Sequence, residues 1–211
     1  MSRIFIVLFA LIILVFPGGC LNLNQSHKKI EYYMMEYESP HITGLKPLPV
    51  AIKLERFGVT AAYDTKQIIY RDKTYARNAY VYHKWQSRPG ALLDHFLVRD
   101  FRQSGLFKAV FPHYTKFPAS YILSGSVDDF LEWDNENGWE AVLTLTVTLQ
   151  DKKIIDVNKR ILLHKSFSSR QVCTDRNPQA LTKAMSRAMA EISEKIIIEV
   201  ATALKNRQDD S

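Results

Sequence analysis

The chain has 211 residues, of which 46% are hydrophobic and 24% are charged. This length suits one domain, or one domain with an appendage, and the composition is that of a globular protein rather than a disordered or collagen-like chain. Only one apolar stretch approaches membrane-spanning length, which excludes a polytopic transporter. The formal charge of +6 would allow anionic partners such as lipid headgroups or nucleic acid.

The first twenty residues have the features of an export signal. Residues 4–16 contain no polar side chain and follow Arg3, and the small residues Gly18 and Gly19 stand directly before Cys20. A basic start, an apolar core and small residues at a cleavage site are the parts of a secretory signal. A helix over these thirteen residues would rise about 20 Å, less than the roughly 30 Å of a hydrocarbon core. We therefore expect export, with ordinary secretion or retention as an uncleaved anchor as the alternatives.

The small pair before Cys20 resembles a bacterial lipobox, in which the cysteine sulfur receives a diacylglyceryl group. On this interpretation residues 1–19 are a lipoprotein signal peptide, Cys20 is the lipidation site and residues 20–30 form a polar tether. Several acyl chains, palmitate among them, would anchor the protein stably. Position 21 is Leu rather than Asp, which in a Gram-negative host resembles the signal for outer-membrane delivery. The expected location is the periplasmic face of the outer membrane.

Alternating apolar and polar residues predict a series of strands in the rest of the chain. The segment that begins at Tyr32 and is stopped by Pro40 is the first, and an Asn137-Gly138 turn joins two long strands. A lone Cys173 is expected to be a partly buried small residue. The predicted strands cover residues 32–37, 50–57, 68–71, 79–85, 107–111, 121–133, 139–150 and 161–170.

Two helices are predicted among these strands. The first opens at Pro89 and closes at Gly105, and the second is about thirty residues long with Asn177 as its N-cap. An apolar stripe marks the second helix as one laid across a sheet. The expected fold is α+β, a mostly antiparallel sheet packed by a mid-chain helix and a long C-terminal helix. It forms one domain over residues 31–207, followed by a tail at 208–211.

The chain shows no motif that would indicate an enzyme, a metal site or a cofactor. Its six histidines are never spaced as a helical metal pair, and the acidic stretch around Gly138 lacks a carboxylate at the first position of a calcium loop. The Ser124-Gly125-Ser126 run lacks the first glycine of a nucleophile elbow. Gly125 is instead expected to mark a bulge or a close approach of the backbone. We expect no catalytic residue and no cofactor.

Residues 63–88 mix basic and aromatic side chains. Such a surface suits single-stranded nucleic acid, anionic lipid headgroups or a partner protein, and a merely solvated basic face is the plain alternative. The export signal argues against nucleic acid. The candidate residues for contact with a partner or a headgroup are Arg71, Lys73, Tyr80, Tyr82 and Trp85.

The order of these pieces resembles a known family, the ABC-type transport auxiliary lipoproteins, a PqiC-like family that works beside MCE-domain proteins. The resemblance rests on Tyr32-Tyr33, on the strand at residues 50–54 and on the run YDTKQIIYR at 63–71. It continues with Trp85 before the first helix and with ASYILSGSV at 119–127.

The resemblance implies a non-catalytic, outer-membrane-anchored subunit of a system that moves lipids across the envelope. Its partners would be an MCE-domain protein and, indirectly, an inner-membrane ABC permease and ATPase. The membrane would be contacted through acylated Cys20; phospholipid binding and a homo-oligomer are left open. A stand-alone chaperone for lipid, lipopolysaccharide or outer-membrane proteins is the alternative, and a component of a secretion pore is a third.

Overall fold

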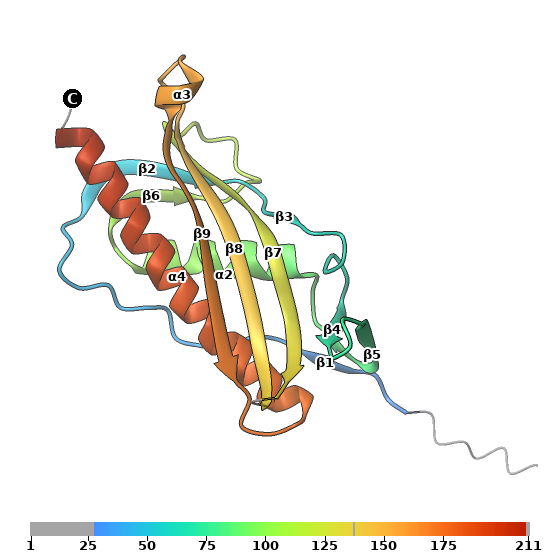
Figure 1. Ribbon diagram of the computed structural model, residues 1–211. Helices are drawn as coiled ribbons and strands as arrows, with labels where there is room; N and C mark the ends of the chain where they lie inside the picture. Colours follow the sequence, from blue (N-terminus) through green and yellow to red (C-terminus); the bar gives the residue numbers. More distant parts are fainter. Residues whose placement is uncertain (1–27, 137, 210–211) are drawn as a thin grey trace, which may run out of the picture.

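The computed structural model describes residues 28–136 and 138–209 (Figure 1). The helices are α2 (Pro89–Gln103), α3 (Val157–Arg160) and α4 (Pro178–Asp209). The strands are β1 (Glu31–Tyr33), β2 (Leu48–Leu54), β3 (Gly58–Val59), β4 (Gln67–Arg71), β5 (Arg77–Trp85), β6 (Phe107–Phe111), β7 (Tyr121–Asn135), β8 (Gly138–Asp151) and β9 (Ile161–Val172).

The long strand β7 organises the nine-stranded sheet. Along one edge it pairs antiparallel with β8, and β8 pairs antiparallel with β9. Along its other edge β7 pairs in parallel with three short strands in turn: β2 at its start, β3 in its middle and β4 near its end. The strands β5 and β1 continue the sheet beyond β4, and β6 continues it beyond β2. The β4–β5 hairpin thus lies beside the far end of β7 (Figure 1).

The sheet is mixed, which corrects the prediction of a mostly antiparallel sheet. Five of its eight strand pairings are parallel, and three are antiparallel. Hairpins such as β7–β8 are visible in the sequence because a short turn joins their strands. Parallel partners need long crossover connections, so alternation within a strand does not reveal which distant strand lies beside it.

Most predicted elements form where the sequence places them. The helix α2 begins at Pro89 and ends before Gly105, whose φ of 66° is the left-handed conformation that closes many helices. At the start of α4 the Asn177 Oδ1 accepts a hydrogen bond from the Ala180 N–H at 2.8 Å, as expected of an N-cap. The first strand is shorter than predicted, and β3 and α3 were not predicted.

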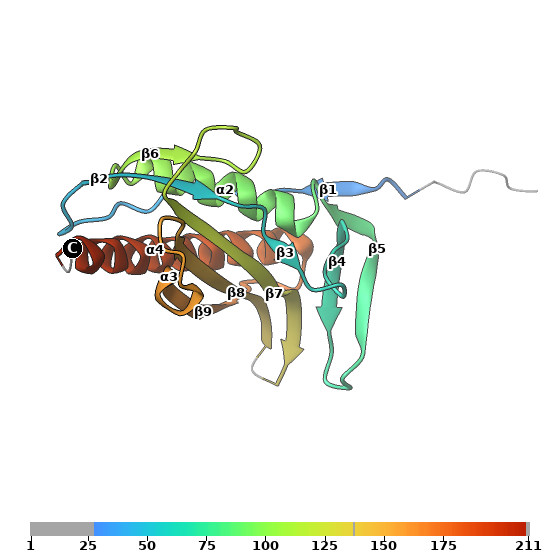
Figure 2. The same ribbon diagram turned by 90° about the horizontal axis from the view of Figure 1, so that it is seen from above.

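The apolar stripe of α4 packs on β8 and β9, so the helix runs diagonally across these strands (Figure 1). The second long helix, α2, packs against β6 and also contacts α4, and both helices are seen from above in Figure 2. Within the described ranges, no helix is long and apolar enough to cross a membrane. The stripe residues of α4 are all buried: Leu181, Met185, Ala188, Ile192, Ile196, Val200 and Leu204.

Gly125 stands where the backbone of β7 approaches its neighbours closely. A Cβ atom there would collide with the backbone oxygen of Thr146 on β8 and with the ring of Phe57. This confirms the expected close approach, and the sheet also has a register irregularity three residues further on, between Val127 and Asp129. The Ser-Gly-Ser run therefore has a packing role in the centre of the sheet.

Candidate functional site

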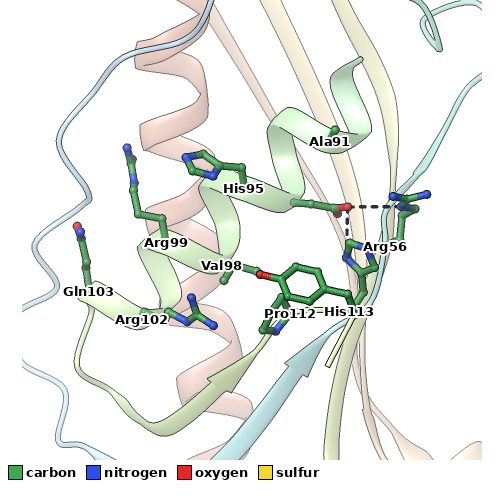
Figure 3. A pocket seen from close by; sticks show the side chains of 11 residues that line it. Arg56, Ala91, His95, Val98, Arg99, Arg102, Gln103, Pro112 and His113 are labelled. Atoms are coloured by element: carbon green, nitrogen blue, oxygen red, sulfur yellow. Dashed lines mark ion pairs between the residues drawn. The ribbon is translucent and has the colours of Figure 1, made fainter. Parts of the chain in front are cut away.

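The first candidate site is a pocket of about 520 Å³ on the outward side of α2, and we call it the basic pocket (Figure 3). Helix α2 contributes one wall, the segment after β6 contributes the facing wall, and Arg56 closes one end. Six ionisable side chains that line it decide its charge: Arg56, Asp94, His95, Arg99, Arg102 and His113.

Asp94 lies beside Arg56 and His113 at one end of the basic pocket. Its Oδ2 lies 3.8 Å from Arg56 Nε and 3.7 Å from His113 Nδ1, distances that allow ion pairing but no hydrogen bond (Figure 3). The other oxygen, Oδ1, accepts a hydrogen bond from the Phe57 N–H at 3.2 Å. Burial raises the pKa of Asp94, and the Phe57 N–H, His113 and Arg56 partly oppose that rise.

The two arginines on α2 differ in what they contact. Arg99 lies over the ring of Tyr37 at 4.3 Å, donates to the Tyr37 carbonyl and pairs with buried Asp100. Among the described residues, Arg102 makes one hydrogen bond, from its Nε to the Val110 carbonyl at 3.2 Å. Figure 3 shows Arg102 pointing across the pocket toward Pro112, while Arg99 points away. Arg102 therefore presents its remaining guanidinium nitrogens to the pocket.

The second candidate site lies where the β4–β5 hairpin meets the β7–β8 hairpin, and its two faces carry different side chains. On one face Arg71 stacks on Trp133 with 4.7 Å between the guanidinium carbon and the ring centroid, and Arg170 stacks on the same ring at 4.3 Å. Lys73 is exposed in the turn that follows β4. We call Arg71, Lys73, Trp133 and Arg170 the arginine face.

The tyrosines of β5 belong to a different environment. Tyr80 and Tyr82 line a pocket of about 460 Å³ that also holds Tyr70 and Trp139, and we call it the tyrosine pocket. Its acids are Asp72, Glu132 and Asp134, so this pocket is acidic rather than basic. The structure therefore separates the predicted basic and aromatic residues: Arg71 and Lys73 lie apart from the tyrosines that were expected to act with them.

Glu132 is the unusual group of the tyrosine pocket because only 1% of its surface is exposed. Both of its carboxylate oxygens accept from the Tyr80 hydroxyl, at 3.0 and 3.1 Å. Burial raises its pKa to about 7, against the lowering effect of the Tyr80 hydrogen bond. A carboxyl group on a sheet strand is thus poised to change charge near neutral pH.

Trp85 does not lie on a contact surface, contrary to the expectation from the sequence. It is 1% exposed, and its ring packs edge-on against Phe130 with 5.1 Å between centroids. Trp85 ends β5 and is the only buried residue of that strand. Its place in the resemblance to the auxiliary lipoproteins is therefore explained by packing.

The structure describes only one of the two cysteines, Cys173. Cys20 lies outside the described residues, so its lipidation stays a prediction. Cys173 is 8% exposed, as expected of a partly buried small residue, and burial raises its pKa to about 11. A thiol with that pKa is a poor nucleophile at neutral pH. Among residues 28–136 and 138–209, no group of three or more His, Cys, Asp or Glu side chains could hold a metal ion.

The basic pocket was missed by the sequence reasoning because its residues come from three separate segments. Arg56 follows β2, His113 follows β6, and Asp94, Val98 and Arg102 recur every four residues along α2. Side chains at this spacing share one face of a helix. This spacing could have predicted that the three α2 residues share one face of the helix. Nothing in the sequence indicates which loops lie opposite that face.

Comparison with protein families gives a match over most of the fold just described. Residues 37–197 match the family described as ABC-type transport auxiliary lipoprotein component. The chain belongs to this family. The resemblance noted from the sequence is thereby confirmed, and the matched segment runs from before β2 to within α4. Comparison with curated proteins gives no match.

Solved structures share the fold of this auxiliary lipoprotein at low identity. Protein XCC0632 from Xanthomonas campestris has a TM-score of 0.76 and 14% identity, covering 85% of this chain and 99% of its own. An uncharacterized protein has a TM-score of 0.64 and 13% identity, covering 82% and 99%. The hypothetical protein CT253 from Chlamydia trachomatis has a TM-score of 0.54 and 8% identity, covering 73% and 96%.

Proposed function

We propose that this auxiliary lipoprotein is the non-catalytic, lipid-anchored accessory subunit of an MCE/ABC-type intermembrane lipid transport system. It docks or orients the MCE conduit at the periplasmic face of the outer membrane. The observation that carries the proposal is the family match over residues 37–197. The lipobox-like sequence that ends at Cys20 supports the anchor, because acyl chains fix a protein to one membrane without a spanning helix.

Docking fits the two pockets better than carriage of a lipid does. A lipid tail in water costs about 0.8 kcal/mol for each exposed methylene, so a carrier must enclose the tail in apolar walls. Each pocket sets charged side chains beside apolar or aromatic ones: Asp94 and Arg102 lie beside Val98 in the basic pocket, and three acids lie beside aromatic side chains in the tyrosine pocket. Charged groups in a wall suit a headgroup or a protein side chain better than an acyl tail, so the proposal assigns the lipid path to the partner.

The arginine face is the surface best suited to hold that partner. Stacking of Arg71 and Arg170 on the Trp133 ring limits their side-chain freedom before any partner binds. Arginine and tryptophan are the residue types that most often dominate binding energy at interfaces. Exposed Lys73 adds positive charge at the rim, where charge mainly steers association.

The first test is to purify the full-length, C-terminally tagged protein from its own detergent-solubilised membranes and to identify its partners by mass spectrometry. Recovery of an MCE-domain protein with an ABC permease and ATPase is the expected result. A Cys20→Ala form is the control for anchoring and should lose membrane association. Recovery of lipid, or of an outer-membrane assembly machine, without MCE or ABC components would overturn the proposal in favour of a stand-alone chaperone.

Charge reversal tests the docking surface itself. Arg71→Glu combined with Lys73→Glu should reduce recovery of the MCE partner, because the arginine face would lose its positive charge. The matched control is Lys108→Glu with Lys116→Glu, two exposed lysines on and after β6 that change the net charge equally. Thermal unfolding of both double variants checks the fold. Equal recovery with the two variants would exclude the arginine face as the contact.

A further inference from the structure

We propose that the basic pocket is a binding site for a phosphate ester group. Its volume of about 520 Å³ lies within the range of small-ligand sites. Three arginines and two histidines line it, against the single carboxylate of Asp94. Arginine favours phosphate because its planar fork of N–H donors matches pairs of phosphate oxygens.

Arg102 is the anchor of this site. The hydrogen bond from its Nε to the Val110 carbonyl fixes the plane of the guanidinium, and its other nitrogens have no partner among the described residues. Because the side chain is already oriented across the pocket (Figure 3), a phosphate would not need to order it first. The exposed side chain of Tyr114 lines the facing wall and adds a hydroxyl donor.

Arg56 and His113 supply donors at the other end of the pocket. Both lie beyond hydrogen-bond distance from Asp94, and 73% of the Arg56 side chain is exposed. Their N–H groups therefore keep capacity for a stronger acceptor. Arg99 also lines the pocket and adds positive charge, but its guanidinium is already engaged by the Tyr37 carbonyl and by Asp100.

The phosphate group has two sources, a glycerophospholipid headgroup or a free phosphate. Assigning it to the headgroup rests on the proposed function, since a subunit anchored at a membrane meets phospholipid at high local concentration. An acidic segment of a protein partner would also be attracted by this charge. The proposal commits to phosphate because the guanidinium of Arg102 offers paired N–H donors that match two phosphate oxygens.

Calorimetry on the full-length protein in a neutral detergent and a phosphate-free buffer tests the site with three probes: inorganic phosphate, dihexanoyl phosphatidylglycerol and an acidic peptide. Inorganic phosphate and the lipid should both bind. Tighter binding of the lipid than of inorganic phosphate would identify a phospholipid headgroup as the natural ligand, and equal or weaker binding of the lipid would identify free phosphate. Arg102→Gln and Arg56→Gln should each weaken binding about tenfold, because each removes a hydrogen bond to a charged group.

Arg88→Gln is the matched control because Arg88 is exposed outside the pocket, in a surface ion pair with Asp64. Arg56→Gln removes no side-chain hydrogen bond within residues 28–136 and 138–209, so it stays informative if Arg102→Gln unfolds the protein. Absence of phosphate binding, or equal loss with Arg88→Gln, would overturn the site. Tighter binding of the peptide, lost in the same variants, would assign the pocket to a protein partner. Recovery of the MCE partner is a separate readout, so either proposal can fail alone.

Discussion

The basic pocket and the tyrosine pocket have opposite charge and are built in different ways. The basic pocket gathers side chains that end near solvent, such as those of Arg56 and Arg102, around the outward side of α2. In the tyrosine pocket, Glu132 is 1% exposed and belongs to the long strand β7. Changes in the first pocket should therefore act on binding, whereas changes around the second should act on stability.

The same difference appears in the carboxylates of the two pockets. Burial raises the pKa of both Asp94 and Glu132, but Asp94 has Arg56 and His113 near it, which lower its pKa, whereas Glu132 has a hydroxyl and a second acid, Asp134. Cationic neighbours favour the charged form of a carboxyl group, and acidic neighbours disfavour it. Asp94 is thus a counter-ion for its pocket, while Glu132 is a buried group whose charge opposes folding.

Replacing Trp85 should give the largest effect and should leave the basic pocket intact. Trp85→Ala removes a ring that packs on Phe130 beneath the β4–β5 hairpin, and large-to-small changes of this kind cost about 3–5 kcal/mol. Urea unfolding monitored by circular dichroism measures the loss. Tyr82→Ala, at a side chain of the same strand that is 41% exposed, should cost much less. Equal losses for the two variants would show that Trp85 is not part of the core.

Glu132→Gln should change how stability depends on pH. The pKa of Glu132 is about 7 in the folded protein and near 4.5 when unfolded, so the folded state holds the proton more tightly. Stability is then highest below about pH 4.5 and falls as the pH rises to about 7, by about 3 kcal/mol from this group. The glutamine should remove that fall and stabilise the protein at pH 8.

Denaturant midpoints measured between pH 4 and pH 8 check this expectation. Glu136→Gln is the control, because Glu136 is an exposed acid in the turn after the same strand. Other titrating groups act equally in both variants, so the difference between them isolates Glu132. A pH profile of Glu132→Gln parallel to that of the control would mean that the buried carboxyl group does not oppose folding.

The two pockets also show what could be predicted from the sequence. Local signals placed the elements correctly: Asn177 caps α4, Gly105 ends α2, and alternation marks β8. The relation between distant strands was not predictable, because the parallel pairing of β4 with β7 brings together segments about sixty residues apart. That pairing places Tyr70 beside Glu132 and Arg71 beside Trp133, and alternation along β4 turns these two neighbouring side chains to opposite faces. Basic and aromatic composition alone could not show this division.

The smallest expected effect is on the affinity of the basic pocket for phosphate, because the negative charge of Asp94 repels an anion there. Asp94→Asn removes the negative charge beside Arg56 and His113 while keeping an oxygen that can accept from the Phe57 N–H. Partly exposed ion pairs are worth less than about 1 kcal/mol, so phosphate should bind about two- to fivefold more tightly. Calorimetry against Asp64→Asn, the acid of a surface pair with Arg88 outside the pocket, isolates the local effect. Weaker binding of phosphate would mean that Asp94 positions Arg56 and His113 for the anion. The Asp94 carboxylate would then promote phosphate binding instead of reducing it.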